Sequence, residues 1–436
     1  MHQKLLWIAG CGVLLIGIIL PDYIAHQRDP VGGPDDADLT VVHETISQPE
    51  NGLSHLLEAV QVSHFNDADE LLMAAVWAGE DVQPGDVAIL LEDNAQALGR
   101  LREALAAPHF RLPEAAADEF EFAPEIPLET QRLVDLLRLQ AQHNASLGNW
   151  DTAFDNALDI LRLAQRVEGA NQAVLTTTML SIGYRAEGLE TLRHLVADAP
   201  LGSTQARRWV GELPSYRSDP SAWKRMWAVE YQQWKSLLGW ISERAVQASR
   251  LDSKANPNSE LAALDIEMLR SQTRRTLKMF ADLTRVYQRA SERNCTALSD
   301  LPFPQTRATY SLDDDDESDL DAIAFEIEAP DYRDFFLRRC AEDTALAATQ
   351  TLIALRAFQQ DQGQLPEELS DLVPDYLDAI PTDAFRGEPI RYSRARKLVY
   401  SLGTDGIDNI DDIDGAGTEN ADPASEFSEP SYPIEF

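Results

Sequence analysis

Cysteine is scarce in this chain of 436 residues, which contains only Cys11, Cys295 and Cys340. No two of them have the Cys-x-x-Cys spacing of zinc-binding sites, which argues against a structural zinc centre. If the bulk of the chain lies outside the cytoplasm, an oxidising environment allows one disulfide, between Cys295 and Cys340. We therefore expect a fold that depends on its hydrophobic core rather than on many cross-links.

Positive charge is also in short supply. The chain has 37 Lys and Arg against 73 Asp and Glu, and its formal net charge is −36. A field of this sign repels phosphate backbones and anionic lipid head groups, and it attracts cations. We therefore expect no nucleic acid among the partners of this protein.

The motifs of the common hydrolases and nucleotide enzymes are missing. The chain has no His-Glu-x-x-His, no Gly-x-Ser-x-Gly, no phosphate-binding loop and no dinucleotide-binding glycine pattern. All eight histidines lie at or before His194, so a histidine-dependent site must lie in the first 194 residues. There, His55 and Glu58 share a predicted helix face and His143 lies further along. These residues are the basis of the alternative of a hydrolase, but we favour their interpretation as a surface pair and assign no catalytic residue.

Only one long hydrophobic run occurs, from Leu5 to Leu20, and the residues after Pro21 can extend it. Because a bilayer core needs about 20 apolar residues, we predict a transmembrane anchor over residues 1–25. Lys4 precedes the run and an Asp-rich segment follows it, which predicts an internal N-terminus and a periplasmic bulk. A cleaved signal peptide lacks its small-residue site here, and a lipoprotein signal at Cys11 lacks a full apolar core.

Helical periodicity dominates the next part of the chain. Residues 26–50 are rich in Pro, Gly and Asp and are predicted to be a linker, and residues 51–300 are predicted to form a large α-helical domain. Within that domain, residues 131–165 resemble one tetratricopeptide-type helical hairpin, with small residues at the helix crossing and Gly148 at the turn. A single copy predicts a hairpin, not an array of repeats.

Aromatic and acidic clusters mark the end of this helical region. Trp223, Trp227 and Tyr231 recur at every fourth position, and we predict that they face the core. The run Asp313–Glu317 lies in a stretch without periodicity, so we predict an acidic loop over residues 301–330.

The remaining residues have a different pattern. A helical stripe ends at Gly363, and the segments 390–392 and 398–400 are predicted to be short strands joined by a turn. Residues 344–422 contain TALAATQTLIALRAFQQDQGQLPEEL, LVPDYLDAIPTDAFRGEPIRY and KLVYSLGTDGIDNIDDIDGAGTENAD, and they resemble the C-terminal half of the type II secretion major pseudopilin. The resemblance implies a small α+β domain at 331–436.

The closing loop of that family binds calcium, so the resemblance also implies a calcium site here. Asp405 and Asp422 match the ligand-bearing ends of the loop, and its middle is longer and more acidic than in the family, which leaves Asp408 and Asp411 as further alternatives. Calcium takes six to eight oxygen ligands from carboxylates and backbone carbonyls. The predicted ligands are Leu402, Thr404, Asp405, Asp412, Asp414 and Asp422.

These features predict a mainly α protein in three parts: an N-terminal transmembrane helix, a large α-helical domain and a small α+β pseudopilin-like domain. We expect a single-pass protein of the bacterial inner membrane with its bulk in the periplasm. The missing catalytic motifs favour a non-catalytic envelope or secretion-associated scaffold that binds a protein partner. The alternative is a periplasmic hydrolase with a site in the helical domain, and calcium is the expected cofactor.

Overall fold

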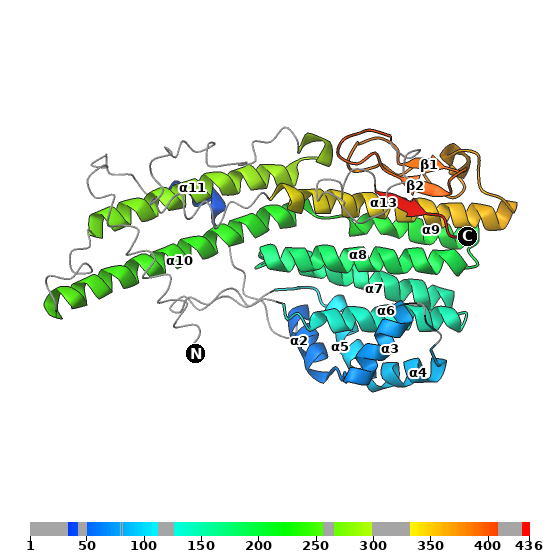
Figure 1. Ribbon diagram of the computed structural model, residues 1–436, viewed down its shortest axis with the longest axis horizontal. Helices are drawn as coiled ribbons and strands as arrows, with labels where there is room; N and C mark the ends of the chain where they lie inside the picture. Colours follow the sequence, from blue (N-terminus) through cyan, green and yellow to red (C-terminus); the bar gives the residue numbers. More distant parts are fainter. Residues whose placement is uncertain are drawn as a thin grey trace.

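The computed structural model describes residues 34–41, 50–78, 80, 82–111, 126–255, 266–298, 332–408 and 430–436, and these are mainly helical, as predicted. The α-helices are α2 (Gly52–Val62), α3 (Asp67–Trp77), α4 (Pro84–Asp93), α5 (Ala95–Ala106), α6 (Thr130–Ser146), α7 (Trp150–Glu168), α8 (Leu175–Asp198), α9 (Ser203–Glu212), α10 (Pro220–Ala255), α11 (Ile266–Glu292) and α13 (Arg333–Gln362). The 3₁₀ helices are η2 (Ala37–Leu39), η4 (Leu213–Tyr216), η5 (Cys295–Ala297) and η7 (Leu369–Leu372). Figure 1 shows the α-helices in layers, with α2–α5 on one side and α13 on the other.

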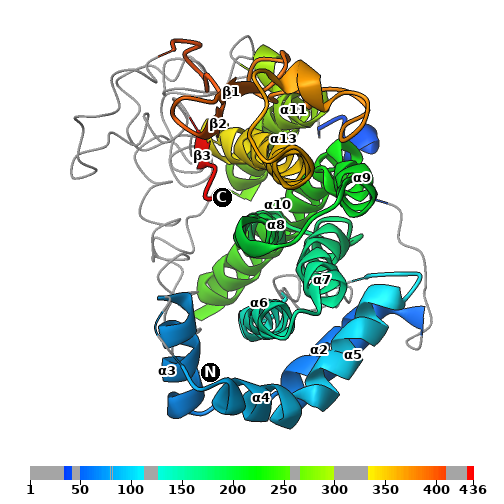
Figure 2. The same cartoon turned by 90° about the vertical axis from the view of Figure 1, so that its right-hand side faces the viewer.

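The helices α2 to α5 form a curved outer layer next to α6 and α7 (Figure 2). Local signals fix where two of them begin: Asn66 caps α3 by accepting from two backbone NH groups, and Pro84 occupies the first position of α4. Asn94 is fully buried between α4 and α5 and exchanges hydrogen bonds with the backbone of His64. The layer covers a core that it shares with α6 and α7.

Helices α6 and α7 form the hairpin that the sequence predicts at 131–165. Leu133 and Leu137 are fully buried, and Gly148 adopts a φ of +77° at the turn, which glycine tolerates because it has no Cβ. Helix α7 then packs along α8, where a Cβ at Gly188 would lie only 2.6 Å from Leu161 Cδ2. A glycine is therefore needed at position 188 for the close approach of these two helices.

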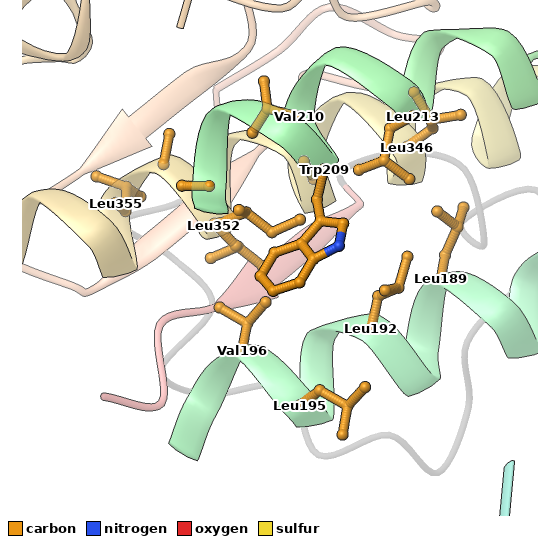
Figure 3. Packing of buried hydrophobic residues seen from close by; sticks show 14 of the residues in the cluster. Leu189, Leu192, Leu195, Val196, Trp209, Val210, Leu213, Leu346, Leu352 and Leu355 are labelled. Atoms are coloured by element: carbon orange, nitrogen blue, oxygen red, sulfur yellow. The ribbon is translucent and has the colours of Figure 1, made fainter. Parts of the chain in front are cut away.

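One large hydrophobic core joins α7, α8, α9 and α13. Trp209 of α9 is fully buried in it and stacks on Phe154 of α7, with 3.9 Å between the ring centroids. Figure 3 shows the Trp209 ring between Leu192 and Val196 of α8 and Leu352 of α13. The C-terminal helix α13 thus completes a core whose other helices come from the predicted helical domain.

A buried charge pair lies where α7, α8 and the start of α10 meet. Arg185 of α8 donates to Glu168 Oε2 of α7 at 3.0 Å, and both side chains are 1% exposed. Glu168 also accepts from Trp223 Nε1 at 2.7 Å and from the Ser218 hydroxyl. Buried charges are tolerated when they are paired and hydrogen-bonded, so this network holds the first turn of α10 against the body.

Helices α10 and α11 form a long hairpin, here called the arm, which extends away from the other helices (Figure 1). At its base, Trp223, Trp227 and Tyr231 are buried, and the two tryptophan rings contact Phe336 of α13. The prediction that this aromatic stripe faces the core is therefore confirmed.

Two further links fasten the base of the arm. Cys295, which follows α11, forms a disulfide with Cys340 of α13, as the sequence allowed. Lys235 of α10 pairs with Asp36, just before η2, at 2.6 Å, and Leu39 of η2 is buried in the aromatic core. Part of the predicted linker thus packs on the arm.

The C-terminal region forms a small sheet against α13. Strands β1 (Arg391–Ser393) and β2 (Leu398–Tyr400) pair antiparallel, as predicted, and β3 (Ser431–Pro433) pairs with the other side of β2. Helix α13 ends at Gly363, whose φ of +73° is the left-handed cap that glycine favours.

The predicted anchor at 1–25 and the acidic loop at 301–330 lie outside the described residues, and the linker is described only at 34–41 and 50. Within the parts of the chain that are described, no helix is both long and apolar enough to cross a membrane.

Candidate partner-binding groove

Helix α8 is enclosed by other helices except along one stripe. It packs against α6, α7, α10 and α13, which bury most of its residues. Among the buried residues, exposed or half-buried ones recur at intervals of three and four positions. Such intervals place residues on one face of a helix, so the interruptions form one continuous line. We call this line the α8 stripe; its members are exposed or half-buried, and they are Thr176, Leu180, Gly183, Glu187, Glu190, His194 and Ala197.

A cavity of about 300 Å³ lies at the N-terminal end of the α8 stripe, and we call it the α6–α8 cavity. Ile126, just before α6, and Gln131 of α6 line one side of it, while residues of α8 line the other. Leu128 and Met179 also line it and are 74% and 51% exposed, respectively. The cavity therefore offers apolar surface to a molecule that enters from solvent.

The middle of the α8 stripe is polar. Glu187 accepts hydrogen bonds from Gln131 Nε2 at 2.8 Å and from Arg138 Nη1 at 3.4 Å. The Arg138 guanidinium lies 4.4 Å from the ring centroid of Trp77, which is a cation–π contact. Burial raises the pKa of Glu187 and that of the nearby Asp135 above the usual carboxyl range, although Gln131 and Arg138 act in the opposite direction. Gln131 and Arg138 of α6 thus hold the Glu187 carboxyl group in place.

A second cavity, of about 190 Å³, lies at the C-terminal end of the stripe. It is lined by Arg193 and His194 of α8, by Leu352 of α13 and by Phe436. The Arg193 guanidinium lies 5.4 Å from the ring centroid of Tyr432 in β3, and burial lowers its pKa. The α8 stripe therefore connects two cavities, on the side of the molecule between α6 and β3 (Figure 2).

The predicted calcium ligands are described in part. Leu402 is buried, and its carbonyl oxygen accepts from the backbone NH of Gly406 at 3.2 Å, whereas Thr404 and Asp405 are exposed. Asp405 Oδ1 accepts from the backbone NH of Ile407 at 3.0 Å, which stabilises a tight turn. The other predicted ligands lie outside the described residues; they are Asp412, Asp414 and Asp422.

The structure thus places three of the predicted ligands in one turn, and the calcium site stays a prediction. Asp408, one of the alternatives, instead forms an ion pair with Arg391 Nη1 at 3.0 Å. Across the described ranges, no three side chains of His, Cys, Asp or Glu are grouped as they would be to hold a metal ion.

The residues of the hydrolase alternative form a surface ion-pair cluster. His55 Nδ1 lies 3.6 Å from Glu103 Oε2. Arg100 lies 3.4 Å from Glu58 and 2.7 Å from Glu103. Neither cavity on the α8 stripe is lined by these side chains or by His143. His55 and Glu58 thus form ion pairs with Glu103 and Arg100, respectively, rather than with each other.

The sequence predicts a helix at α8 but does not reveal its stripe. A helix that is buried on most sides has apolar residues almost all round, so its single open face produces little periodic signal. The usable signal is local: Thr176 and the helix-interior Gly183, both on the stripe, stand where a core helix usually has larger apolar residues.

Comparisons of the chain with protein-family models, with curated proteins and with solved structures find no match. No family is therefore assigned from them.

Proposed function

We propose that this protein is a non-catalytic scaffold of the bacterial envelope that holds a segment of a partner protein along the α8 stripe. The observation that carries the proposal is the continuity of the stripe, which joins the α6–α8 cavity to the cavity beside Phe436. Interfaces combine buried anchor side chains with surrounding polar contacts. The α8 stripe and its two cavities, together called the groove, offer two anchor positions with a polar stretch between them.

The length of the stripe suits a short peptide segment. Thr176 and Ala197 are separated by 21 positions on one helix, which corresponds to about 30 Å at 1.5 Å per residue. An extended segment of about nine residues covers that distance. Glu187 and Glu190 in the middle favour a partner residue that donates hydrogen bonds or carries positive charge.

Three features support the location and the cofactor. The disulfide between Cys295 and Cys340 supports an oxidising compartment such as the periplasm. The apolar run in residues 1–25 supports a membrane anchor with the N-terminus inside. The resemblance of residues 344–422 to the major pseudopilin supports a secretion-associated role, with calcium bound near Asp405.

Blocking the stripe tests the proposal. A Cβ at Gly183, on the stripe, or at Gly211, on α9, would meet no atom within 4 Å, so both positions accept a long side chain. Purified wild-type protein, Gly183→Arg and Gly211→Arg are each used to capture proteins from solubilised membranes, which are then quantified by mass spectrometry. We expect a protein that wild type and Gly211→Arg retain and Gly183→Arg loses. Equal capture by all three forms contradicts the groove.

The calcium proposal has its own test. A ligand that binds only the folded state raises the melting temperature with the logarithm of its free concentration. The full-length protein should therefore melt at a higher temperature in calcium than in chelator, and Asp405→Ala or Asp422→Ala should remove the difference. A melting temperature that does not depend on calcium refutes this part of the proposal and leaves the groove unaffected.

A further inference from the structure

Helix α11 has the opposite charge balance to the chain that contains it. It holds six Lys and Arg against three Asp and Glu, whereas the formal net charge of the whole chain is −36. Four of the cations and Asp282 recur at intervals of three and four positions, which places them along one face of the helix. We call these four cations the α11 row; they are Arg275, Lys278, Arg285 and Arg289.

The α11 row keeps an excess of positive charge at the surface of the arm. Lys278 and Arg289 are exposed, and Arg275 is half-buried. Arg285 lies 2.9 Å from Asp282, so it offsets the acid that interrupts the row. The other three cations therefore remain to attract an anionic partner.

The negative charge of the whole chain does not cancel this local charge. At physiological ionic strength, exposed charges that are farther apart than about 8 Å are largely screened from each other. The row extends from Arg275 to Arg289, which corresponds to about 21 Å at 1.5 Å per residue. An anionic surface that lies against the row therefore meets mainly the cations of the row.

The predicted membrane anchor ends within reach of the α11 row. Arg285 lies 2.7 Å from Asp38, and its Nη2 donates a hydrogen bond to the carbonyl oxygen of Asp35. The N-terminal chain is thus fastened to the row itself. Ten positions separate Asp35 from the end of the anchor at residue 25, and a chain of this length spans at most about 35 Å. The surface of the membrane that holds the anchor is therefore the anionic surface that the row can reach without a further partner.

We infer that the α11 row docks on anionic phospholipid head groups at the membrane surface; this rests on the anchor in the proposed function. Each Lys or Arg near an anionic bilayer contributes about a fivefold gain in binding. Guanidinium groups suit phosphate oxygens because they donate two parallel hydrogen bonds to them. Docking fixes the orientation of the arm relative to the bilayer.

The test measures how fast Lys278 is acetylated in full-length protein reconstituted in lipid nanodiscs, with one copy in each disc. The discs contain phosphatidylcholine alone or a mixture of phosphatidylcholine and phosphatidylglycerol, and mass spectrometry quantifies each lysine. We expect Lys278 to react about fivefold more slowly in the mixed discs, as for a row that is docked about four-fifths of the time. Lys254 and Lys397 are exposed and lie off the row, so their rates should change little. At about 1 M salt, where the Debye length falls to about 3 Å, the difference should disappear.

A matched pair of double variants shows whether the row is responsible. Arg275→Gln/Arg289→Gln removes two cations from the row, keeps Lys278 as the reporter, and should restore fast acetylation in the mixed discs. Arg244→Gln/Arg250→Gln removes the same charge from exposed positions of α10 and should leave Lys278 protected. Melting temperatures of both variants show whether either is unfolded. Equal effects of the two variants on the Lys278 rate contradict the α11 row.

The outcomes separate this inference from the proposed function. Equal rates for Lys278 in the two lipids overturn the inference, and a slow rate in both would assign the row to an acidic protein segment instead. A chain that does not enter the discs refutes the anchor of the proposed function. The same rates are then measured with the chain added to vesicles of the two compositions, where slower reaction on anionic vesicles supports the row and equal rates overturn it. Partner capture by the groove is a separate measurement and does not depend on either result.

Discussion

Helix α8 and the arm are both long helical elements, yet their surroundings are opposite. Helix α8 contacts four other α-helices and reaches solvent mainly along its stripe, whereas beyond its base the arm consists of α10 and α11 packed on each other (Figure 1). The arm also differs in charge from the chain as a whole. Residues 220–293 contain 13 Lys and Arg against 8 Asp and Glu, whereas the net charge of the whole chain is −36.

The contrast shows where the free energy of folding resides. Around α8, apolar side chains are fully buried and the Glu168–Arg185 pair is excluded from solvent, so each substitution there alters many contacts. On the part of the arm away from its base, here called the outer arm, the side chains of Arg250 and Lys278 are exposed. A substitution there alters few contacts. Substitutions around α8 should therefore cost more stability than substitutions on the outer arm.

The largest effect should come from the buried charge pair. Glu168→Gln leaves the Arg185 guanidinium buried without its carboxylate, and breaking such a pair costs about 3–5 kcal/mol of unfolding free energy. Urea unfolding followed by circular dichroism measures the change. The control is Asp378→Asn, which breaks the Arg207–Asp378 pair on the surface, where Asp378 is 90% exposed, and should cost less than about 1 kcal/mol. Similar losses in both variants would contradict the contrast between buried and exposed charge.

The disulfide at the base of the arm ranks second. It closes a loop with a sequence separation of 45, and removing a bond of this kind costs about 2–4 kcal/mol. The variant Cys295→Ser/Cys340→Ser should melt at a lower temperature than oxidised wild type in a calorimetric scan. A reductant should lower the melting temperature of wild type only, since the variant lacks the bond; an effect on both would point to another cause.

Two glycines on α8 should respond in opposite directions. A Cβ at Gly188 would lie 2.6 Å from Leu161 Cδ2, so Gly188→Ala overpacks the α7–α8 contact and should cost about 1–3 kcal/mol. Gly183 faces open space in the helix interior, and Gly183→Ala should stabilise the protein by up to about 1 kcal/mol through helix propensity. Chemical denaturation of both variants provides the measurement, and losses in both would mean that the stripe is packed rather than open.

A buried carboxyl on α13 should make stability depend on pH. Burial raises the pKa of Glu342 to about 7 from an ordinary value of 4.5, although Arg185 and Arg193 oppose the shift, and its Oε2 has no hydrogen-bond partner. Because the folded protein retains this proton more tightly than the unfolded chain, the contribution is complete below pH 4.5 and is lost as the pH rises through 7.

The variant Glu342→Gln, which cannot ionise, should therefore be more stable than wild type at pH 8 and should lose less stability than wild type between pH 5 and pH 8. Urea midpoints at pH 5 and pH 8 report the difference. A variant that loses as much stability as wild type between these two values would show that another group is responsible.

The smallest effects belong to the outer arm. Arg250→Ala and Lys278→Ala remove exposed cations and should change the unfolding free energy by less than about 0.5 kcal/mol. Arg285→Ala, at the base, should cost more, because Arg285 pairs with Asp38 at 2.7 Å and with Asp282 at 2.9 Å. A large loss from Lys278→Ala in a denaturation curve would mean that the outer arm packs on more than its own two helices.

Much of the local structure could be predicted because its causes are local. The left-handed end of α13 at Gly363, the β1–β2 hairpin and the α6–α7 hairpin each follow from neighbouring residues. The contact of Asp36 with Lys235 joins residues 199 positions apart, and no local pattern encodes it. The α6–α8 cavity is equally non-local, since Ile126, α6 and α8 must be placed before the residues that line it can be recognised.

The bond between Cys295 and Cys340 also has a mechanical consequence. Tension applied between the two ends of the chain passes from one sulfur directly to the other, so the residues between them carry no load while the bond is intact. With a sequence separation of 45, the reduced chain can extend about 150 Å further than the oxidised one before it is taut. Under load, the redox state of these two cysteines therefore sets the length to which this protein can be stretched.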